Sequence, residues 1–138
     1  MLVNNLDRVP NEWDRKTTKL IVTYPEYAIM MKELVRELSD YTFSDIYGFP
    51  RGGLPIAVHL SHHLKIPLII SGIGPNTLVV DDVLDTGETI HKIRKVFPEI
   101  QIATLFYKPG KDHFHIPPNF YLYTTNNWVV YPWEDPLD

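Results

Sequence analysis

The sequence predicts an α/β fold in which a mostly parallel sheet is flanked by helices. Apolar, β-rich runs of strand length alternate with helix-length segments whose apolar residues recur at helical spacing. Two loops, Pro50–Gly53 and Asp81–Thr89, each follow a predicted strand and precede a predicted helix. This alternation favours parallel strands covered on both faces. In such sheets, ligands bind beyond the carboxyl ends of the strands.

The first predicted elements are a short strand and an amphipathic helix. Residues 18–24 are β-rich and predict a strand at an edge. Pro25 suits the first turn of a helix, and apolar residues at helical spacing continue that helix to about Ser39. Residues 44–49 form the next apolar run of strand length, and the glycine loop ends it.

The rest of the core is predicted from the same two periodicities. The expected elements are a helix at 54–64 with a largely apolar face, a brief strand at 67–71, a tight connection at 72–76, a strand at 78–81, a helix at 87–97 and a strand at 100–107. We expect the strand at 78–81 to end at Asp81 and Asp82, because burying unpaired carboxylates is costly.

The texture of the chain changes after residue 108. Five of the twelve prolines lie beyond this point, and only residues 120–124 are β-like. We therefore expect one domain over residues 1–138. Its core would span about 18–108, and a short irregular C-terminal hood would span about 109–138.

Composition excludes several classes of function. The 138 residues carry a net charge of −4 without a run of lysine or arginine, so neither nucleic acid nor a membrane is an expected partner. No cysteine is present, which excludes disulfides and thiolate chemistry. The N-terminus is too polar for a signal peptide, and no apolar run approaches membrane-spanning length. We expect a cytoplasmic protein.

The loop at 85–89 has the features of a phosphate site. It offers backbone N–H groups, the hydroxyls of Thr86 and Thr89, and the positive end of a helix dipole. Just upstream, Asp81 and Asp82 could accept hydrogen bonds from vicinal sugar hydroxyls or coordinate a hard cation. A phosphate and a diol about one ribose apart describe a ribose 5-phosphate.

A second anion site is predicted at Pro50–Gly53, where glycines let backbone amides approach and Arg51 supplies charge. Taken alone, each motif has a structural explanation: the acidic string could be a capped turn, and arginine followed by two glycines is a common loop. Their shared position after a strand and before a helix favours one composite site.

Four segments resemble a known family. Val79–Thr89 looks like the phosphoribosyl pyrophosphate (PRPP) signature of the type I phosphoribosyltransferases, and Tyr47–Gly53 is similar to their pyrophosphate loop. Tyr107–Pro109 and Trp128–Glu134 resemble the purine-specific members, especially the bacterial xanthine-guanine phosphoribosyltransferases. The resemblance implies Mg²⁺-dependent transfer of the 5-phosphoribosyl group of PRPP to guanine, xanthine or hypoxanthine. Pyrophosphate would leave, and a nucleoside 5′-monophosphate would form.

The resemblance also implies a role for each matching residue. Asp85 would sit beside N7 of the purine and manage its proton. Lys108 would donate to O6 of the base, Trp128 would stack on it, and the Val129 carbonyl could accept from an exocyclic amino group. Without the family, Lys108 could be a solvated lysine and Trp128 plain hydrophobic cover. The other implied roles are ribose binding by Asp81 and Asp82, 5-phosphate binding by Thr86, Gly87, Glu88 and Thr89, pyrophosphate binding by Arg51 and Gly52, and Mg²⁺ binding by Asp82 and Glu134.

One part of the family pattern is missing. Type I transferases usually carry a long flexible loop that closes over the reactants and excludes water. Here only Ser71–Asn76 stands in its place, which is too short for a lid. A neighbouring subunit or the tail at 111–127 could supply cover. The alternative function is a lidless regulatory protein that binds PRPP or a purine nucleotide with little or no turnover. The apolar second helix and the resemblance both favour a homodimer or higher homo-oligomer.

His59 and His63 lie one helical turn apart on the second predicted helix, a spacing that could hold a metal. No acidic third ligand is evident, so we expect solvated or interface histidines.

Overall fold

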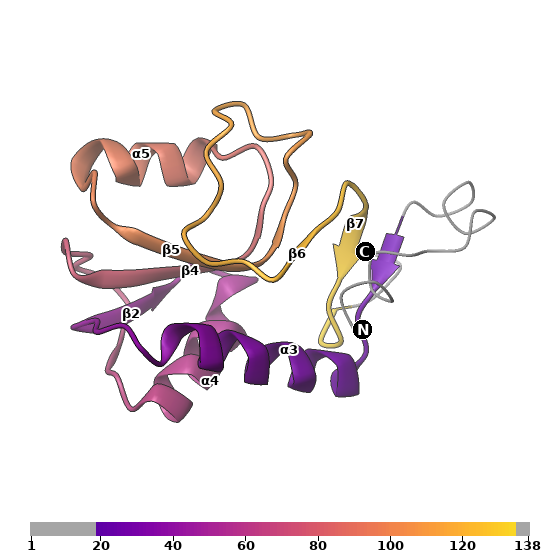
Figure 1. The fold of residues 1–138 in the computed structure, drawn as a ribbon, viewed down its shortest axis with the longest axis horizontal. Coiled ribbons are helices and arrows are strands. Elements are labelled where there is room, and N and C mark those ends of the chain that lie inside the picture. The colour runs from indigo at the N-terminus through magenta and orange to yellow at the C-terminus, as the bar shows by residue number, and fades with distance from the viewer. Residues whose placement is uncertain (1–18, 135–138) are drawn as a thin grey trace.

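The computed structural model describes residues 19–134, and its centre is a five-stranded parallel sheet (Figure 1). Across the sheet, the strands are β3 (Leu68–Ile69), β2 (Asp45–Gly48), β4 (Thr77–Leu84), β5 (Gln101–Tyr107) and β6 (Tyr123–Thr124). Helices α3 (Tyr24–Leu38) and α4 (Gly53–Leu64) cover one face, and α5 (Glu88–Val96) covers the other. The predicted fold class is confirmed. The predicted division into a core and a hood stays a prediction, and its two ends lie outside the described residues.

Helix α3 begins as its sequence predicts. The N-cap Thr23 and the third helical residue Glu26 form a capping box, in which the Thr23 N–H donates to Glu26 Oε1 at 2.9 Å and the Glu26 N–H donates to Thr23 Oγ1 at 3.3 Å. Pro25 occupies the first turn, where its missing N–H costs nothing. The buried face of the helix then packs on the sheet through Met30, Leu34 and Leu38.

The central strands are buried on both faces because helices lie on both sides. In β4, Leu78 and Val80 join the core beneath α3 and α4, while Val79 points to the opposite core beneath α5. Ile90 of α5 and Ile102 of β5 belong to that second core. Alternate residues of one strand thus fix a helix on each side of the sheet.

Strand β4 is longer than predicted. It continues through both aspartates to Leu84, and it stays paired with β5 from Asp81 opposite Thr104 to Leu84 opposite Tyr107. The prediction that the strand stops at Asp81 is wrong. The carboxylates are tolerated because each accepts a hydrogen bond from a backbone N–H. The Asp82 N–H donates to Asp81 Oδ1, and the Val83 N–H donates to Asp82 Oδ1, both at 2.9 Å.

The C-terminal segment contains more strand than predicted. Besides β6, it forms β7 (Trp128–Val130), which pairs in parallel with β1 (Lys19–Ile21) in a separate two-stranded sheet. Figure 1 shows this pair beside the start of α3. The Val22 N–H extends the ladder by donating to the Val130 carbonyl at 2.9 Å. The strand expected at residues 18–24 corresponds to the shorter β1, and Tyr24 already belongs to α3; Thr18 lies outside the described residues.

The connection between β3 and β4 is short. Because both strands run parallel to β2, residues 70–76 must carry the chain from the carboxyl edge of the sheet back to its amino edge. Ile73 packs against the second core on the way, and the Gly74 N–H donates to Thr77 Oγ1 at 2.9 Å. A segment used entirely for this crossing cannot also close over a ligand.

Candidate active site

Three segments reach the same edge of the sheet. The glycine loop follows β2, the acidic loop follows β4, and Lys108 follows β5, and these strands are parallel neighbours. The Phe49 N–H donates to the Val80 carbonyl at 2.9 Å, which ties the first two segments together. The Lys108 N–H donates to the Leu84 carbonyl at 2.9 Å, which ties the last two. Backbone hydrogen bonds therefore link the three segments along this edge of the sheet.

Gly52 lies directly against Asp82. A Cβ atom at position 52 would collide with the Asp82 carboxylate, so the close approach of this loop requires glycine. A Cβ atom at Gly53 would lie 2.5 Å from the Val80 carbonyl oxygen. Arg51 is exposed at the tip of the loop, and the Pro50–Arg51 peptide is cis. The pyrophosphate loop predicted from the sequence is thus adjacent to the predicted ribose carboxylates.

The two aspartates of β4 are electrostatically coupled. Burial, together with the neighbouring Asp82 carboxylate, raises the pKa of Asp81 to about 8. The hydroxyl of buried Tyr131 donates to the Asp82 main-chain carbonyl at 2.9 Å. The end of β4 is therefore held on one side by the glycine loop and on the other by the C-terminal segment.

The loop that begins α5 has the features of an anion site. Gly87 is the N-cap with a φ of +81°, and the Glu88 N–H makes a long contact of 3.4 Å with Thr86 Oγ1. Among the described residues, no acceptor bonds the backbone N–H groups of Thr86, Gly87 and Thr89. Free amides at the positive end of a helix favour an anion. The side chain of Glu88 turns toward His113, 3.6 Å away.

Lys108, Asp85 and Trp128 form the part of the site next to this loop. The Lys108 Nζ lies 3.7 Å from Asp85 Oδ2 and 5.4 Å from the centre of the Trp128 ring. Burial lowers the pKa of Lys108, and the Asp85 charge opposes that effect. Asp85 Oδ1 is buried and has no hydrogen-bond partner among the described residues. An unpaired acceptor beside a cation and an exposed indole can bind a planar group with its own donor.

The C-terminal segment completes a cavity over the glycine loop. The cavity has a volume of about 850 Å³, and its lining includes Arg51, Gly52, Trp128 and Glu134. The predicted base-binding residue Val129 is buried one position away, in the strand that pairs with β1. The structure thus brings residues of every predicted subsite to this edge.

Tyr131 contacts both residues predicted to bind Mg²⁺, Asp82 and Glu134. The Tyr131 N–H donates to Glu134 Oε1 at 2.8 Å, and the Tyr131 hydroxyl donates to the main-chain carbonyl of Asp82 at 2.9 Å. Among the described residues, no group of three or more histidines, aspartates or glutamates is placed to hold a metal. Mg²⁺ commonly uses one or two carboxylates together with substrate phosphates and water. The carboxylates of Asp82 and Glu134 are the hard oxygen donors that Mg²⁺ prefers, and their role as its ligands stays a prediction.

Sequence reasoning missed Tyr131. This side chain is buried, and it joins Asp82, Glu134 and Trp133 by two hydrogen bonds and a ring stack at 5.0 Å. The signal was present, because residues 128–131 form a run of β-branched and aromatic residues typical of a strand. It was outweighed by the prolines around it.

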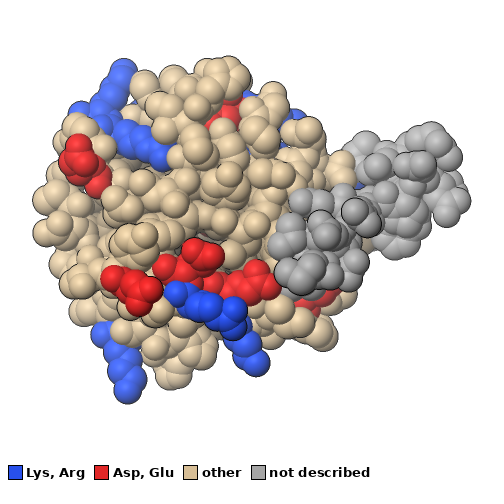
Figure 2. Space-filling view, in the orientation of Figure 1, with Lys and Arg blue, Asp and Glu red and all other residues tan. Residues whose placement is uncertain are grey.

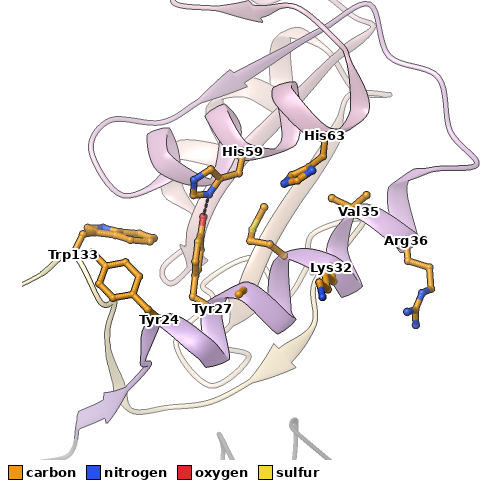
Figure 3. Close-up of a pocket in the computed structure, with 10 residues that line it drawn as sticks. Tyr24, Tyr27, Lys32, Val35, Arg36, His59, His63 and Trp133 are labelled. Atoms are coloured by element: carbon orange, nitrogen blue, oxygen red, sulfur yellow. Dashed lines mark hydrogen bonds between the residues drawn. The ribbon is translucent and has the colours of Figure 1, made fainter.

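His59 and His63 face an apolar groove between α3 and α4 of about 740 Å³ (Figure 3). The Tyr27 hydroxyl hydrogen-bonds His59 Nδ1 at 2.5 Å, and burial lowers the pKa of His59. Trp133 packs edge-on against Tyr27 and also lines the cavity over the glycine loop. The groove and the candidate site therefore share one wall.

The face of the molecule in Figure 2 carries both acidic and basic side chains, and no broad basic surface is visible on it. No helix among residues 19–134 is long and apolar enough to cross a membrane. The expected absence of nucleic-acid and membrane partners and the cytoplasmic location stay predictions.

Taken together, the parallel sheet, the free helix N-terminus, the acid pair and the glycine loop are the features expected of a phosphosugar site at the carboxyl edge of an α/β domain. No protein-family model matches the chain. The xanthine-guanine phosphoribosyltransferase of Chromohalobacter salexigens is 26% identical, over 88% of this chain and 87% of the relative.

Solved structures give the same family. The purine phosphoribosyltransferase from Pyrococcus horikoshii is 31% identical with a TM-score of 0.73, and the match covers 86% of this chain and 95% of that one. The Helicobacter pylori xanthine-guanine-hypoxanthine phosphoribosyltransferase shares the fold, with 21% identity, a TM-score of 0.72 and coverage of 86% and 94%. The chain belongs to the type I phosphoribosyltransferases and lies close to the purine phosphoribosyltransferases.

Proposed function

We propose that this protein transfers the 5-phosphoribosyl group of PRPP to a 6-oxopurine, namely guanine, xanthine or hypoxanthine. The observation that carries this proposal is the contact of Lys108 with both Asp85 and Trp128 beside the phosphate loop. A buried cation, an unpaired carboxylate oxygen and an indole face match the O6, the ring N–H and the π surface of such a base.

PRPP would span the three loops at the sheet edge. Its 5-phosphate would accept hydrogen bonds from the free amides and hydroxyls of residues 86–89. Asp81 and Asp82 would bind the ribose hydroxyls, and Arg51 and Gly52 would bind the pyrophosphate. Mg²⁺, held by Asp82 and Glu134 together with the diphosphate, would neutralise charge on the leaving group.

The purine would lie between Lys108 and Trp128. Lys108 would donate to O6, and the indole of Trp128, which is 55% exposed, offers a face for stacking. The Val129 carbonyl would accept from a 2-amino group, which adenine lacks. These contacts favour bases with an oxygen at position 6.

In the reaction, a purine nitrogen forms a bond to C1 of the ribose while the bond from C1 to the pyrophosphate oxygen breaks. The configuration at C1 inverts, and the proton displaced from the purine passes to Asp85 Oδ1. Positive charge develops on the ribose in the transition state, and the Asp82 carboxylate stabilises it.

The connection at 70–76 is too short to cover the reactants, so another part of the protein would have to do so. Residues 111–127 or a second copy of the chain in a homodimer or larger homo-oligomer would exclude water. Light scattering tests whether a second copy supplies the cover. A mass of at least twice the 16.1 kDa of the chain supports cover by a second copy. A protein that is active and strictly monomeric excludes it.

The test of the function is a substrate panel. Folded protein is incubated with PRPP, Mg²⁺ and each of guanine, xanthine, hypoxanthine and adenine, and the nucleotides formed are separated by chromatography. We expect nucleoside monophosphates from at least one 6-oxopurine and little from adenine. The same assay without Mg²⁺ tests the metal, and absence of product with every base excludes the proposed function.

A second function is favoured by the missing lid: a regulatory protein that binds PRPP or a purine nucleotide with little or no turnover. The variant Asp85→Asn separates the two functions. If turnover by the wild type is measurable, and the variant loses it while retaining PRPP affinity, the chain is an enzyme. Binding of PRPP by the wild type without product supports the regulatory function.

A further inference from the structure

Residues 108–117, called here the strap, run from the end of β5 across the loop that begins α5. At one end, the Lys108 N–H donates to the Leu84 carbonyl. Farther along, the His113 N–H donates to the Thr86 carbonyl at 2.9 Å. The strap is therefore bonded to the acidic loop on both sides of the carboxylate proposed to be catalytic.

Asp112 lies at the centre of the strap. It is 3% exposed, and its carboxylate accepts three hydrogen bonds: from the Tyr107 hydroxyl at 2.8 Å and from the N–H groups of Phe114 and Ile116, both at 3.0 Å. Burial and the bond to Asp112 raise the pKa of Tyr107 to about 12, so the phenol remains a donor at neutral pH. A buried carboxylate needs such donors, and together they fix the shape of the strap.

The same carboxylate touches the N-cap of α5. A Cβ atom at Gly87 would lie 2.6 Å from Asp112 Oδ1, and Gly87 has a φ of +81°. Gly87 supplies no side-chain cap to the helix. Asp112 therefore places a negative charge at the positive end of the α5 dipole, where it is favourable.

Helix α5 holds the far end of the strap. The ring of His91 stacks on Phe114 with centroids 3.9 Å apart and planes 10° from parallel. Arg94 donates to the carbonyls of Ile116 at 3.2 Å and Pro117 at 2.9 Å. The strap is therefore anchored at both ends, and Asp112 lies between the anchors and against Gly87.

We infer that Asp112 is a positioning residue for the 5-phosphate site: it holds the strap against Thr86 and Gly87, and so orients the free amides of that loop. The inference rests on the proposed function, because it takes residues 86–89 to be the phosphate site. Asp112 itself touches no substrate in this arrangement. Its loss should therefore weaken one subsite and leave the glycine loop unchanged.

The first experiment compares two ligands by calorimetry in the presence of Mg²⁺: ribose 5-phosphate for the α5 loop and inorganic pyrophosphate for the glycine loop. The variant is Asp112→Asn, which keeps the shape but places an amide against backbone N–H donors. Its matched control is Asp40→Asn, an exposed aspartate just after α3. We expect affinity for ribose 5-phosphate to fall about tenfold in Asp112→Asn alone, as for a lost charged hydrogen bond. Pyrophosphate affinity should stay within about twofold.

The second experiment follows amide hydrogen exchange in the free protein and needs no ligand. Tyr107→Phe removes one of the three bonds to Asp112 without changing its charge, so this variant serves even if Asp112→Asn fails to fold. We expect faster exchange at the N–H groups of His91 and His113, which donate to the carbonyls of Gly87 and Thr86, and unchanged exchange in β2 and β4. Faster exchange throughout the domain would indicate general destabilisation and would overturn the inference.

The inference fails if folded Asp112→Asn binds ribose 5-phosphate as the wild type does, or if both affinities fall equally. It also fails if the wild type does not bind ribose 5-phosphate. A different result would reject the proposed transfer reaction and leave this inference standing. In that result, ribose 5-phosphate binds and Asp112→Asn weakens its binding, but no purine is converted to a nucleotide.

Discussion

The Nζ of Lys108, 2% exposed, lies 3.7 Å from Oδ2 of Asp85, which is 40% exposed. One end of the pair is thus buried, and the other is partly exposed to solvent. Removing the partner of a buried charge is costly, so the two side chains hold each other in place. In the proposed reaction, the same two groups contact the purine at O6 and N7.

The first prediction concerns this lysine. Lys108→Met keeps the length of the side chain and removes its charge, so the donor to O6 is lost. We expect kcat/KM for the purine to fall by about 10- to 100-fold, as for a charged hydrogen bond. Lys111→Met, an exposed lysine of the strap, is the control and should stay near wild type. Equal activity of the two variants would contradict the assignment of Lys108.

The second prediction is a pH dependence of stability. The pKa of Asp81 is about 8 in the folded protein, well above its ordinary value of 3.8. The folded state therefore binds more protons than the unfolded state between these values. The free energy of unfolding should fall as pH rises from about 4 to about 8, by at most about 1.4 kcal/mol per pH unit, and then level off.

Urea unfolding at intervals from pH 4 to pH 9 measures this slope. Asp81→Asn is the matched variant, since it cannot titrate, and the slope attributed to Asp81 should disappear from its profile. Parallel profiles for the wild type and the variant would show that Asp81 is ionised in the fold.

Tyr131 supplies the third prediction. Tyr131→Phe leaves the ring stack on Trp133 intact and removes the hydrogen bond to the Asp82 carbonyl. We expect a loss of about 1 kcal/mol in the free energy of unfolding, together with weaker PRPP binding. Tyr121→Phe is the control, because its hydroxyl has no hydrogen bond among the described residues and the side chain is 40% exposed. If both variants unfold at the same urea concentration as the wild type, Tyr131 does not brace β4.

The fourth prediction concerns the glycine loop. Gly52→Ala would force the loop away from Asp82, and we expect pyrophosphate and PRPP affinities to fall by at least about tenfold. Gly74→Ala is the control, since its added methyl group would meet only Thr77 Oγ1 at 4.0 Å. Calorimetric titration of each variant with pyrophosphate and Mg²⁺ gives the comparison. Normal affinity in Gly52→Ala would place the pyrophosphate site elsewhere.

Local periodicity was enough to predict the core of the fold. The order of strands and helices from α3 to β5 follows from apolar spacing and from Pro25 in the first turn of α3, which are local signals. Strand β7 was not predicted because its partner, β1, lies at the other end of the chain. No short segment of the sequence indicates this pairing. The end of β4 was misplaced because hydrogen bonds from neighbouring backbone N–H groups make Asp81 and Asp82 acceptable inside a strand.

The candidate site divides in the same way. Its loops were predictable because glycine, acid and hydroxyl residues gather in two short segments that parallel strands bring to one edge. Asp112 contacts Gly87, which lies 25 positions away in the sequence. Tyr131 contacts Asp82, which lies 49 positions away. No periodicity or motif in the sequence marks such contacts, and only the packed chain brings them together.

The most direct test of the central claim is the stoichiometry of products from PRPP and guanine with Mg²⁺, measured by ³¹P NMR. Transfer predicts one nucleoside 5′-monophosphate for each pyrophosphate released, with no product in Asp85→Asn. Pyrophosphate appearing with ribose 5-phosphate and no nucleotide, or PRPP remaining bound and intact, would contradict it.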